Sequence, residues 1–122
     1  MSGFDPQAFM LLAEDLAKCP TEHPIYDAHL RSAISRAYYS AYLAANAKQR
    51  LPTSSHHKLF SYYKQQGDGT LVSIGTRLEC LYRDRVNADY GYLISNLKWV
   101  TASALDEASQ LKTLIDGWPD KI

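Results

Sequence analysis

Cysteine is scarce in this sequence, and an excess of either charge is lacking. The 122 residues contain only Cys19 and Cys80, which form no CxxC pair, so zinc and thiol-redox motifs of that type are excluded. We expect both to be buried free thiols. Basic and acidic residues number 13 each. A neutral chain does not coat nucleic acid through bulk electrostatics, although a local basic site stays open.

Long apolar runs and a basic leader are also missing. No stretch approaches the roughly 18 consecutive apolar residues of a membrane span. The first ten residues, MSGFDPQAFM, lack the basic region and apolar core of a secretory signal. We therefore expect a cytoplasmic protein without a membrane segment.

Motifs for several common chemistries are absent as well. The sequence has no glycine-rich phosphate loop, no HExxH, no paired Glu-x-x-His helices and no GxSxG elbow. Adjacent His56 and His57 would point about 100° apart on a helix, so they are poorly placed to hold one ion. We expect no metal site and no cofactor.

Helical periodicity runs through the whole chain. Hydrophobic residues make up 46% of the sequence, which suits one domain over residues 1–122. Apolar residues recur three and four apart, and connections are short, which predicts an all-α, up-and-down antiparallel bundle of four to five helices. The expected helices run from Asp5-Pro6 to Cys19-Pro20, from about Pro24 to Gln49, from His56 to about Gln66, from Gly69-Thr70 to Gly91, and through a last segment with apolar residues from Leu93 to Ile115.

The same spacing predicts which residues face the core. Many are alanines in the second helix, which allow a neighbouring helix to approach closely. The expected inward residues are Phe9, Leu12, Ala13 and Leu16; Leu30, Ala33, Ile34, Ala37, Tyr38, Ala41 and Ala45; Leu71, Ile74, Leu78 and Leu81; and Leu93, Leu97, Val100, Ala104, Ala108, Leu111 and Ile115.

A polar cluster lies on the fourth expected helix. Glu79, Arg83, Asn87 and Tyr90 are spaced four, four and three apart, so they share one face if the helix reaches Tyr90. One interpretation is a solvated face with a Glu79–Arg83 ion pair. The other is an anion site in which Arg83 holds a phosphate while Asn87 and Tyr90 supply neutral hydrogen bonds. Spacing alone favours the solvated face.

The second helix carries arginine beside tyrosine in an otherwise apolar setting. Arg36 is followed by Tyr38 and Tyr39. Either Arg36 caps a helix or pairs with a carboxylate across the bundle, or these groups face a polar cleft. Four arginines are candidates for a phosphate track, and on a neutral protein we expect at least half of them to pair with carboxylates: Arg31, Arg36, Arg77 and Arg85.

Three motifs in order resemble the HEPN superfamily of prokaryotic helical proteins. Residues 35–41 read Ser-Arg-Ala-Tyr-Tyr-Ser-Ala, residues 55–58 read Ser-His-His-Lys, and residues 82–90 read Tyr-Arg-Asp-Arg-Val-Asn-Ala-Asp-Tyr. Short stand-alone members show an SRAYYA-like helix, a Ser-His-Lys segment before a short helix, and an arginine followed by Ala-Asp-Tyr. The resemblance covers about residues 8–115. It implies a homodimer from a toxin–antitoxin or antiviral system, and many such proteins are metal-independent endoribonucleases.

In that superfamily an Arg-x(4–6)-His motif from each subunit meets in one cleft. The arginine contacts the scissile phosphate and the histidine assists attack by the ribose 2′-hydroxyl. Arg83 matches the arginine, and Tyr90 matches the tyrosine of the variant Arg-x4-His-x-Tyr, which a nucleotidyltransferase antitoxin adenylylates in some members. Ala88 stands at the histidine position, and no histidine follows His57. The loss of that proton carrier costs roughly 10²- to 10⁴-fold in rate.

The resemblance and the spacing together define a candidate site. The catalytic candidates are Arg83, Asn87, Tyr90 and His57, and Tyr90 is also the modification candidate. The candidates for binding RNA or nucleotide are Arg36, Tyr39, Arg83 and Arg85. Three functions stay open: an RNA-cleaving toxin or defence effector, a non-catalytic module that binds RNA, nucleotide or a partner such as a nucleotidyltransferase, and a helical scaffold whose motifs only stabilise a dimer.

Overall fold

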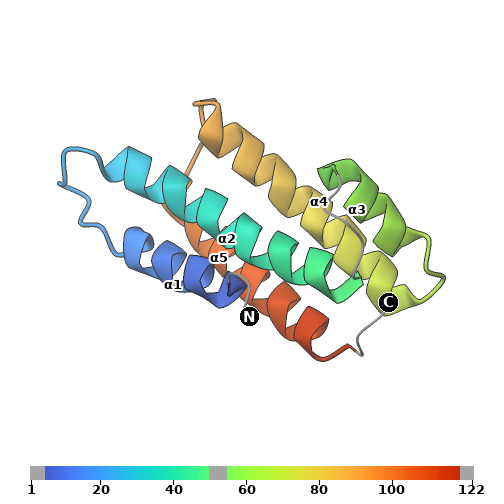
Figure 1. The fold of residues 1–122 in the computed structure, drawn as a ribbon. Coiled ribbons are helices and arrows are strands. Elements are labelled where there is room, and N and C mark those ends of the chain that lie inside the picture. The colour runs from blue at the N-terminus through green and yellow to red at the C-terminus, as the bar shows by residue number, and fades with distance from the viewer. Residues whose placement is uncertain (1–4, 50–54, 119–122) are drawn as a thin grey trace.

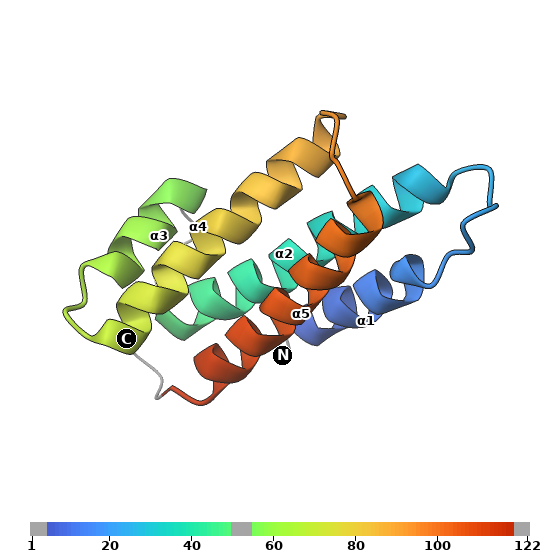
Figure 2. The ribbon, with the colours of Figure 1, turned by 180° about the vertical axis from the view of Figure 1, so that it is seen from behind.

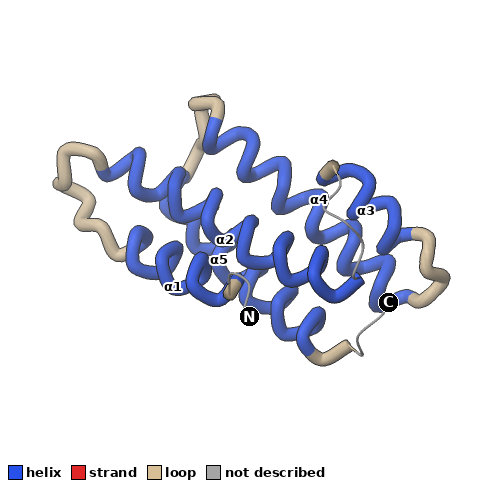
Figure 3. The backbone as a smooth tube through the Cα atoms, viewed as in Figure 1, coloured by secondary structure: helices blue, strands red, loops and turns tan. Residues whose placement is uncertain are grey.

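Five helices and no strand make up the described part of the chain. The computed structural model describes residues 5–49 and 55–118, and within these ranges it confirms the all-α bundle (Figures 1 and 3). None of the helices over these residues is both long enough and apolar enough to cross a membrane. The helices are α1 (Pro6–Ala17), α2 (Tyr26–Gln49), α3 (His56–Lys64), α4 (Gly69–Asp89) and α5 (Leu97–Asp116).

Helix α2 is the centre of the bundle. It packs against α1, α4 and α5, while the short α3 packs against α4. Figures 1 and 2 show α1 and α2 running antiparallel, α4 running back along α2, and α5 returning in the direction of α2. Every expected inward residue of α2, from Leu30 to Ala45, is buried. Its alanines present little side-chain bulk, so three neighbouring helices can lie close to one backbone.

Local capping explains where the helices begin and end. The Asp5 side chain accepts a hydrogen bond from Gln7 N at 2.9 Å, and Pro6 takes the first position of α1. The Ser55 side chain caps α3, and the Asp68 side chain accepts hydrogen bonds from the free N–H groups of Thr70 and Leu71 in the first turn of α4. Gly91, two residues after α4, has a φ of +73°, a left-handed conformation that stops a helix. The expected ends of α1 to α4 are confirmed to within a turn.

Three sequence expectations about burial are wrong. Leu12 is 44% exposed because Met10 and Ala13 take the inward positions of α1. Leu93 is 96% exposed, since α5 starts only at Leu97 and Leu93 lies in the connection before it. The cysteines are free but not buried: Cys19 is half-buried, and Cys80 is exposed because it lies about 200° around α4 from the buried Leu78.

Candidate functional site

The polar face of α4 presents Arg83 to solvent. Arg83 and Asn87 are exposed and lie one helical turn apart. The predicted Glu79–Arg83 ion pair is wrong, because Glu79 instead pairs with Lys64 of α3. That hydrogen bond from Lys64 lowers the pKa of the Glu79 carboxyl, and Arg83 contributes in the same direction. Among the residues that the structure describes, no ion pair joins Arg83 to a carboxylate.

Tyr90 lies just beyond the end of α4 rather than on its last turn. Its backbone N–H donates to Val86 O and caps the helix, and its side chain is 69% exposed. The ring centre lies 6.5 Å from that of Tyr92 in the following connection. We call Arg83, Asn87 and Tyr90 the α4 strip, because the structure brings all three to the exposed side of one helix end.

Arg85 and Tyr39 meet between α4 and α2. The Arg85 guanidinium lies 5.3 Å from the centre of the Tyr39 ring and donates to Asp89 at 2.8 Å. The hydroxyl of Ser35 donates to the same carboxylate at 3.4 Å. Arg36 contacts neither group: it lies 5.2 Å from the centre of the Phe9 ring of α1. The two predicted binding residues of α2 therefore point to different neighbouring helices.

A cluster of aromatic rings lies beside this pair. We call Tyr38, Tyr39, Tyr42, His56 and Tyr82 the tyrosine–histidine cluster; they come from α2, α3 and α4. Tyr38 is fully buried, and its hydroxyl lies 2.6 Å from His56 Nδ1. The His56 ring centre lies 4.5 Å from that of Tyr42 and 5.0 Å from that of Tyr82. The cluster connects α2, α3 and α4 next to the contact between Arg85 and Tyr39.

Burial favours the uncharged forms of Tyr38 and His56. Burial, reinforced by neighbouring tyrosines, raises the pKa of Tyr38 far above its ordinary value. Burial also lowers the pKa of His56, and the positive charge of Arg85 and the neighbouring His57 add to this effect. We therefore assign the Tyr38 hydroxyl as the donor and neutral His56 Nδ1 as the acceptor.

His56, rather than His57, enters the cluster. His57 is exposed and meets the ring of Tyr82 edge-on at 5.4 Å between centres. Sequence reasoning singled out His57 and missed His56. The signal was the spacing of α3, because the buried residues Leu59, Phe60 and Tyr63 follow His56 at three, four and seven positions.

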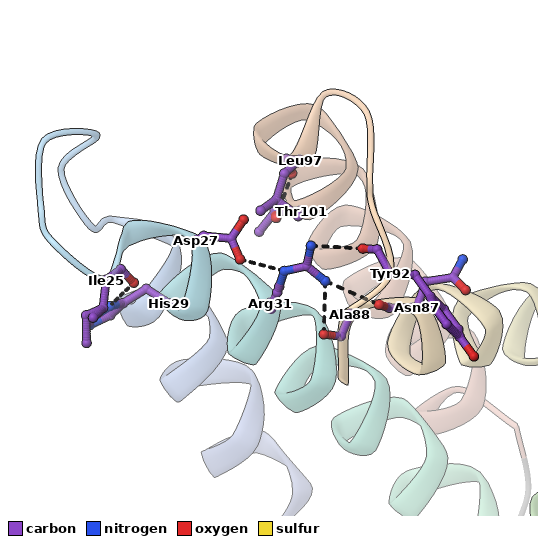
Figure 4. A network of polar contacts seen from close by, with 9 residues as sticks. All are labelled: Ile25, Asp27, His29, Arg31, Asn87, Ala88, Tyr92, Leu97 and Thr101. Carbon is purple, nitrogen blue, oxygen red and sulfur yellow. Dashed lines mark hydrogen bonds and ion pairs between the residues drawn. The ribbon is translucent and has the colours of Figure 1, made fainter. Parts of the chain in front are cut away.

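Arg31 of α2 stabilises the C-terminal end of α4. Its guanidinium donates to Asn87 O at 3.3 Å, to Ala88 O at 3.2 Å and to Tyr92 O at 2.9 Å, and it pairs with Asp27 at 2.6 Å (Figure 4). These are carbonyls at and after the C-terminal turn of α4. With Arg77 paired to Glu107 and Arg85 to Asp89, three of the four track candidates bind carboxylates, which confirms the expectation for at least half.

These contacts define the chemistry that the site can carry. The chain matches no protein-family model, no curated protein and no solved structure. The α4 strip offers an exposed guanidinium, an amide and a phenol, which together suit an anion with several oxygen atoms. The tyrosine–histidine cluster offers a neutral imidazole whose Nδ1 is already engaged.

His56 is expected to make folding stability depend on pH. Because its pKa is lower in the folded protein, the unfolded chain takes up a proton first, so its contribution is complete above about pH 6.5 and declines as the pH falls towards the folded pKa. Urea unfolding between about pH 7.5 and 5.5 should show a steeper loss of stability in the wild type than in His56→Gln. Parallel losses in the two proteins would contradict this assignment.

Proposed function

We propose that the chain is a HEPN-like homodimer that binds RNA through the α4 strip, within a prokaryotic toxin–antitoxin or antiviral system. The observation that carries this proposal is the state of Arg83, which is exposed and has no carboxylate partner among the described residues. Of the other four arginines that the structure describes, Arg31, Arg77 and Arg85 pair with carboxylates. An arginine held at the surface of a helix, with an amide one turn on, is available to take a phosphate in a bidentate contact.

Binding without cleavage is the form of this function that the contacts favour. Ala88, at the histidine position of the resembling motif, is buried and carries no titratable group. His56 Nδ1 is engaged with Tyr38 inside the cluster. Arg85 lies about 200° around α4 from Arg83 and packs on Tyr39, so the strip offers a single guanidinium for RNA phosphate rather than a continuous track.

RNA cleavage is the second candidate, and His57 is the reason to keep it. This imidazole is exposed and packs on Tyr82, the residue that precedes Arg83. In this alternative Arg83 stabilises the phosphate, Asn87 holds it, and His57 or Tyr90 moves the proton.

The proposed dimer has a natural contact region at the α4–α5 connection. Leu93 and Trp99 are 96% and 70% exposed, and Tyr92 is exposed beside them. Large apolar side chains gathered at one end of a bundle are typical of a contact surface. Tyr90 is 69% exposed in the single chain, which suits adenylylation by a partner nucleotidyltransferase before the dimer forms.

Replacing Arg83 with alanine is expected to weaken binding of a short single-stranded RNA about tenfold, because one charged phosphate contact is lost. The slope of log affinity against log salt should also fall by about 0.7. Fluorescence anisotropy measures both. Lys18→Ala is the matched control: it removes one positive charge from an exposed position after α1, which packs on α2 and α5. Equal affinities for wild type and Arg83→Ala would overturn the proposal.

The same proteins decide between binding and cleavage. Wild type and Arg83→Ala are incubated with RNA in excess EDTA, and the products are examined for 2′,3′-cyclic phosphate ends. Intact RNA supports the binding module. Cleavage that Arg83→Ala abolishes supports the ribonuclease, and His57→Gln and Tyr90→Phe then identify the proton carrier. Equal cleavage by both proteins indicates contamination.

A further inference from the structure

Three potential metal ligands converge where α1 passes into α2. The ligand atoms of Cys19, His23 and His29 all lie within 4.8 Å of one another. Cys19 follows the C-cap of α1, His23 lies in the connection, and His29 lies on the first turn of α2. The two imidazole rings meet edge-on with their centres 4.9 Å apart. This group is remote in sequence from the α4 strip and belongs to a different pair of helices.

Backbone hydrogen bonds orient the ligands. His29 Nδ1 lies 3.1 Å from Ile25 O, so it carries the proton and leaves Nε2 as a free electron-pair donor. Figure 4 shows this contact at the start of α2. A ring N–H donated to a backbone carbonyl is the usual support of a metal-bound histidine. Ile25 N donates to His23 Nδ1 at 3.2 Å, and the Cys19 thiol lies 3.7 Å from Pro20 O.

We propose that Cys19, His23 and His29 bind a Zn²⁺ ion, with a water molecule at the fourth position. One thiolate and two imidazoles form the mixed sulfur and nitrogen donor set that zinc favours. A tetrahedral ion places such donors about 3.3–3.6 Å apart. The side chains therefore need to close by about 1 Å, and the exposed position of His23 allows it. On binding, the Cys19 thiol releases its proton to solvent, and His23 exchanges its bond to Ile25 N–H for a bond to the ion.

In the sequence these ligands are spaced Cys-x3-His-x5-His. The prediction of no metal site did not take this spacing into account. That expectation rested on the missing CxxC pair and on the divergence of His56 and His57. The ion joins the end of α1 to the start of α2. It is independent of the RNA-binding proposal, because neither Arg83 nor the tyrosine–histidine cluster contributes a ligand.

The test is titration of the metal-free, reduced protein with Zn²⁺, followed by calorimetry, and with Co²⁺, followed by absorption. We expect one ion per chain and a thiolate-to-cobalt charge-transfer band. Cys19→Ser should abolish the band, and Cys19→Ser and His29→Gln should each lower the affinity about 100-fold or more. Cys80→Ser is the matched control, since it removes the other thiol, and it should bind like the wild type. Wild-type affinity in Cys19→Ser, or a loss of binding in Cys80→Ser, overturns the proposal.

A measurement on the unmodified sequence guards against variants that fail to fold. Iodoacetamide labelling with mass spectrometry reports both thiols of one molecule. Zn²⁺ should slow alkylation of Cys19 by about tenfold or more relative to Cys80, because a metal-bound thiolate is masked. Equal protection of the two cysteines, or none, contradicts the site whatever the variants do.

Discussion

Replacing Gly75 with valine is expected to destabilise the protein by about 3 kcal/mol, close to the upper end of overpacking effects. A Cβ atom at this position would lie 2.9 Å from Phe60 O and 3.0 Å from Tyr63 Cβ. Phe60 and Tyr63 are among the most completely buried side chains, so α3 can relieve the clash only by moving away from α4. Urea unfolding measures the loss.

Gly69→Ala is the matched control for this variant. Gly69 begins the same helix, and a Cβ there would have no atom within 4 Å. Alanine should leave the stability unchanged or raise it by up to about 1 kcal/mol, because the unfolded chain loses freedom. If Gly75→Val unfolded at the wild-type urea concentration, the close packing of α3 on α4 would be wrong.

Truncating Tyr38 to alanine is expected to cost about 3–5 kcal/mol, as for other large buried aromatic residues. The ring is fully buried and lies within 5.2–5.7 Å, centre to centre, of the rings of Tyr39, Tyr42, His56 and Tyr82. The change leaves a cavity at the junction of three helices and deprives His56 Nδ1 of its partner. Chemical unfolding of the two proteins side by side gives the difference.

Two further variants separate the contribution of the Tyr38 hydroxyl from that of its buried ring. Tyr38→Phe keeps the ring and should cost only about 1 kcal/mol, the net value of one hydrogen bond. Tyr39→Ala truncates the adjacent, half-buried tyrosine and should cost clearly less than Tyr38→Ala. Equal losses for Tyr38→Phe and Tyr38→Ala would show that the hydroxyl, and not the packing of the ring, is what the fold requires.

Helix bounds and the buried stripes were predictable because they depend on neighbours in sequence. A cap such as Asp5-Pro6, a glycine such as Gly91 and an apolar period of three and four act within one or two turns. Leu93 misled the same reasoning, because its apolar side chain continues the period of α5 into a connection where no helix forms.

The candidate site was less predictable because it depends on how helices are placed against one another. Glu79 pairs with Lys64, which lies 15 residues away on α3, and not with Arg83 on its own helix face. His56 enters the cluster because α3 lies on α4 at a particular rotation, whereas a pair of adjacent histidines in a sequence gives no preference. The group of Cys19, His23 and His29 likewise needs the turn between two helices to bring its ligands together.

The contact of Arg31 with the end of α4 has a consequence for how the bundle opens. The Arg31 side chain, 56 to 61 residues away in sequence, donates to the carbonyls of that helix end, so fraying of the last turn of α4 requires these hydrogen bonds to break. Local fluctuations of the two helices are thereby coupled into one cooperative unit. The exposed segment that follows, from Tyr90 to Leu93, is held to α2 by the same side chain, through the bond from Arg31 to Tyr92 O.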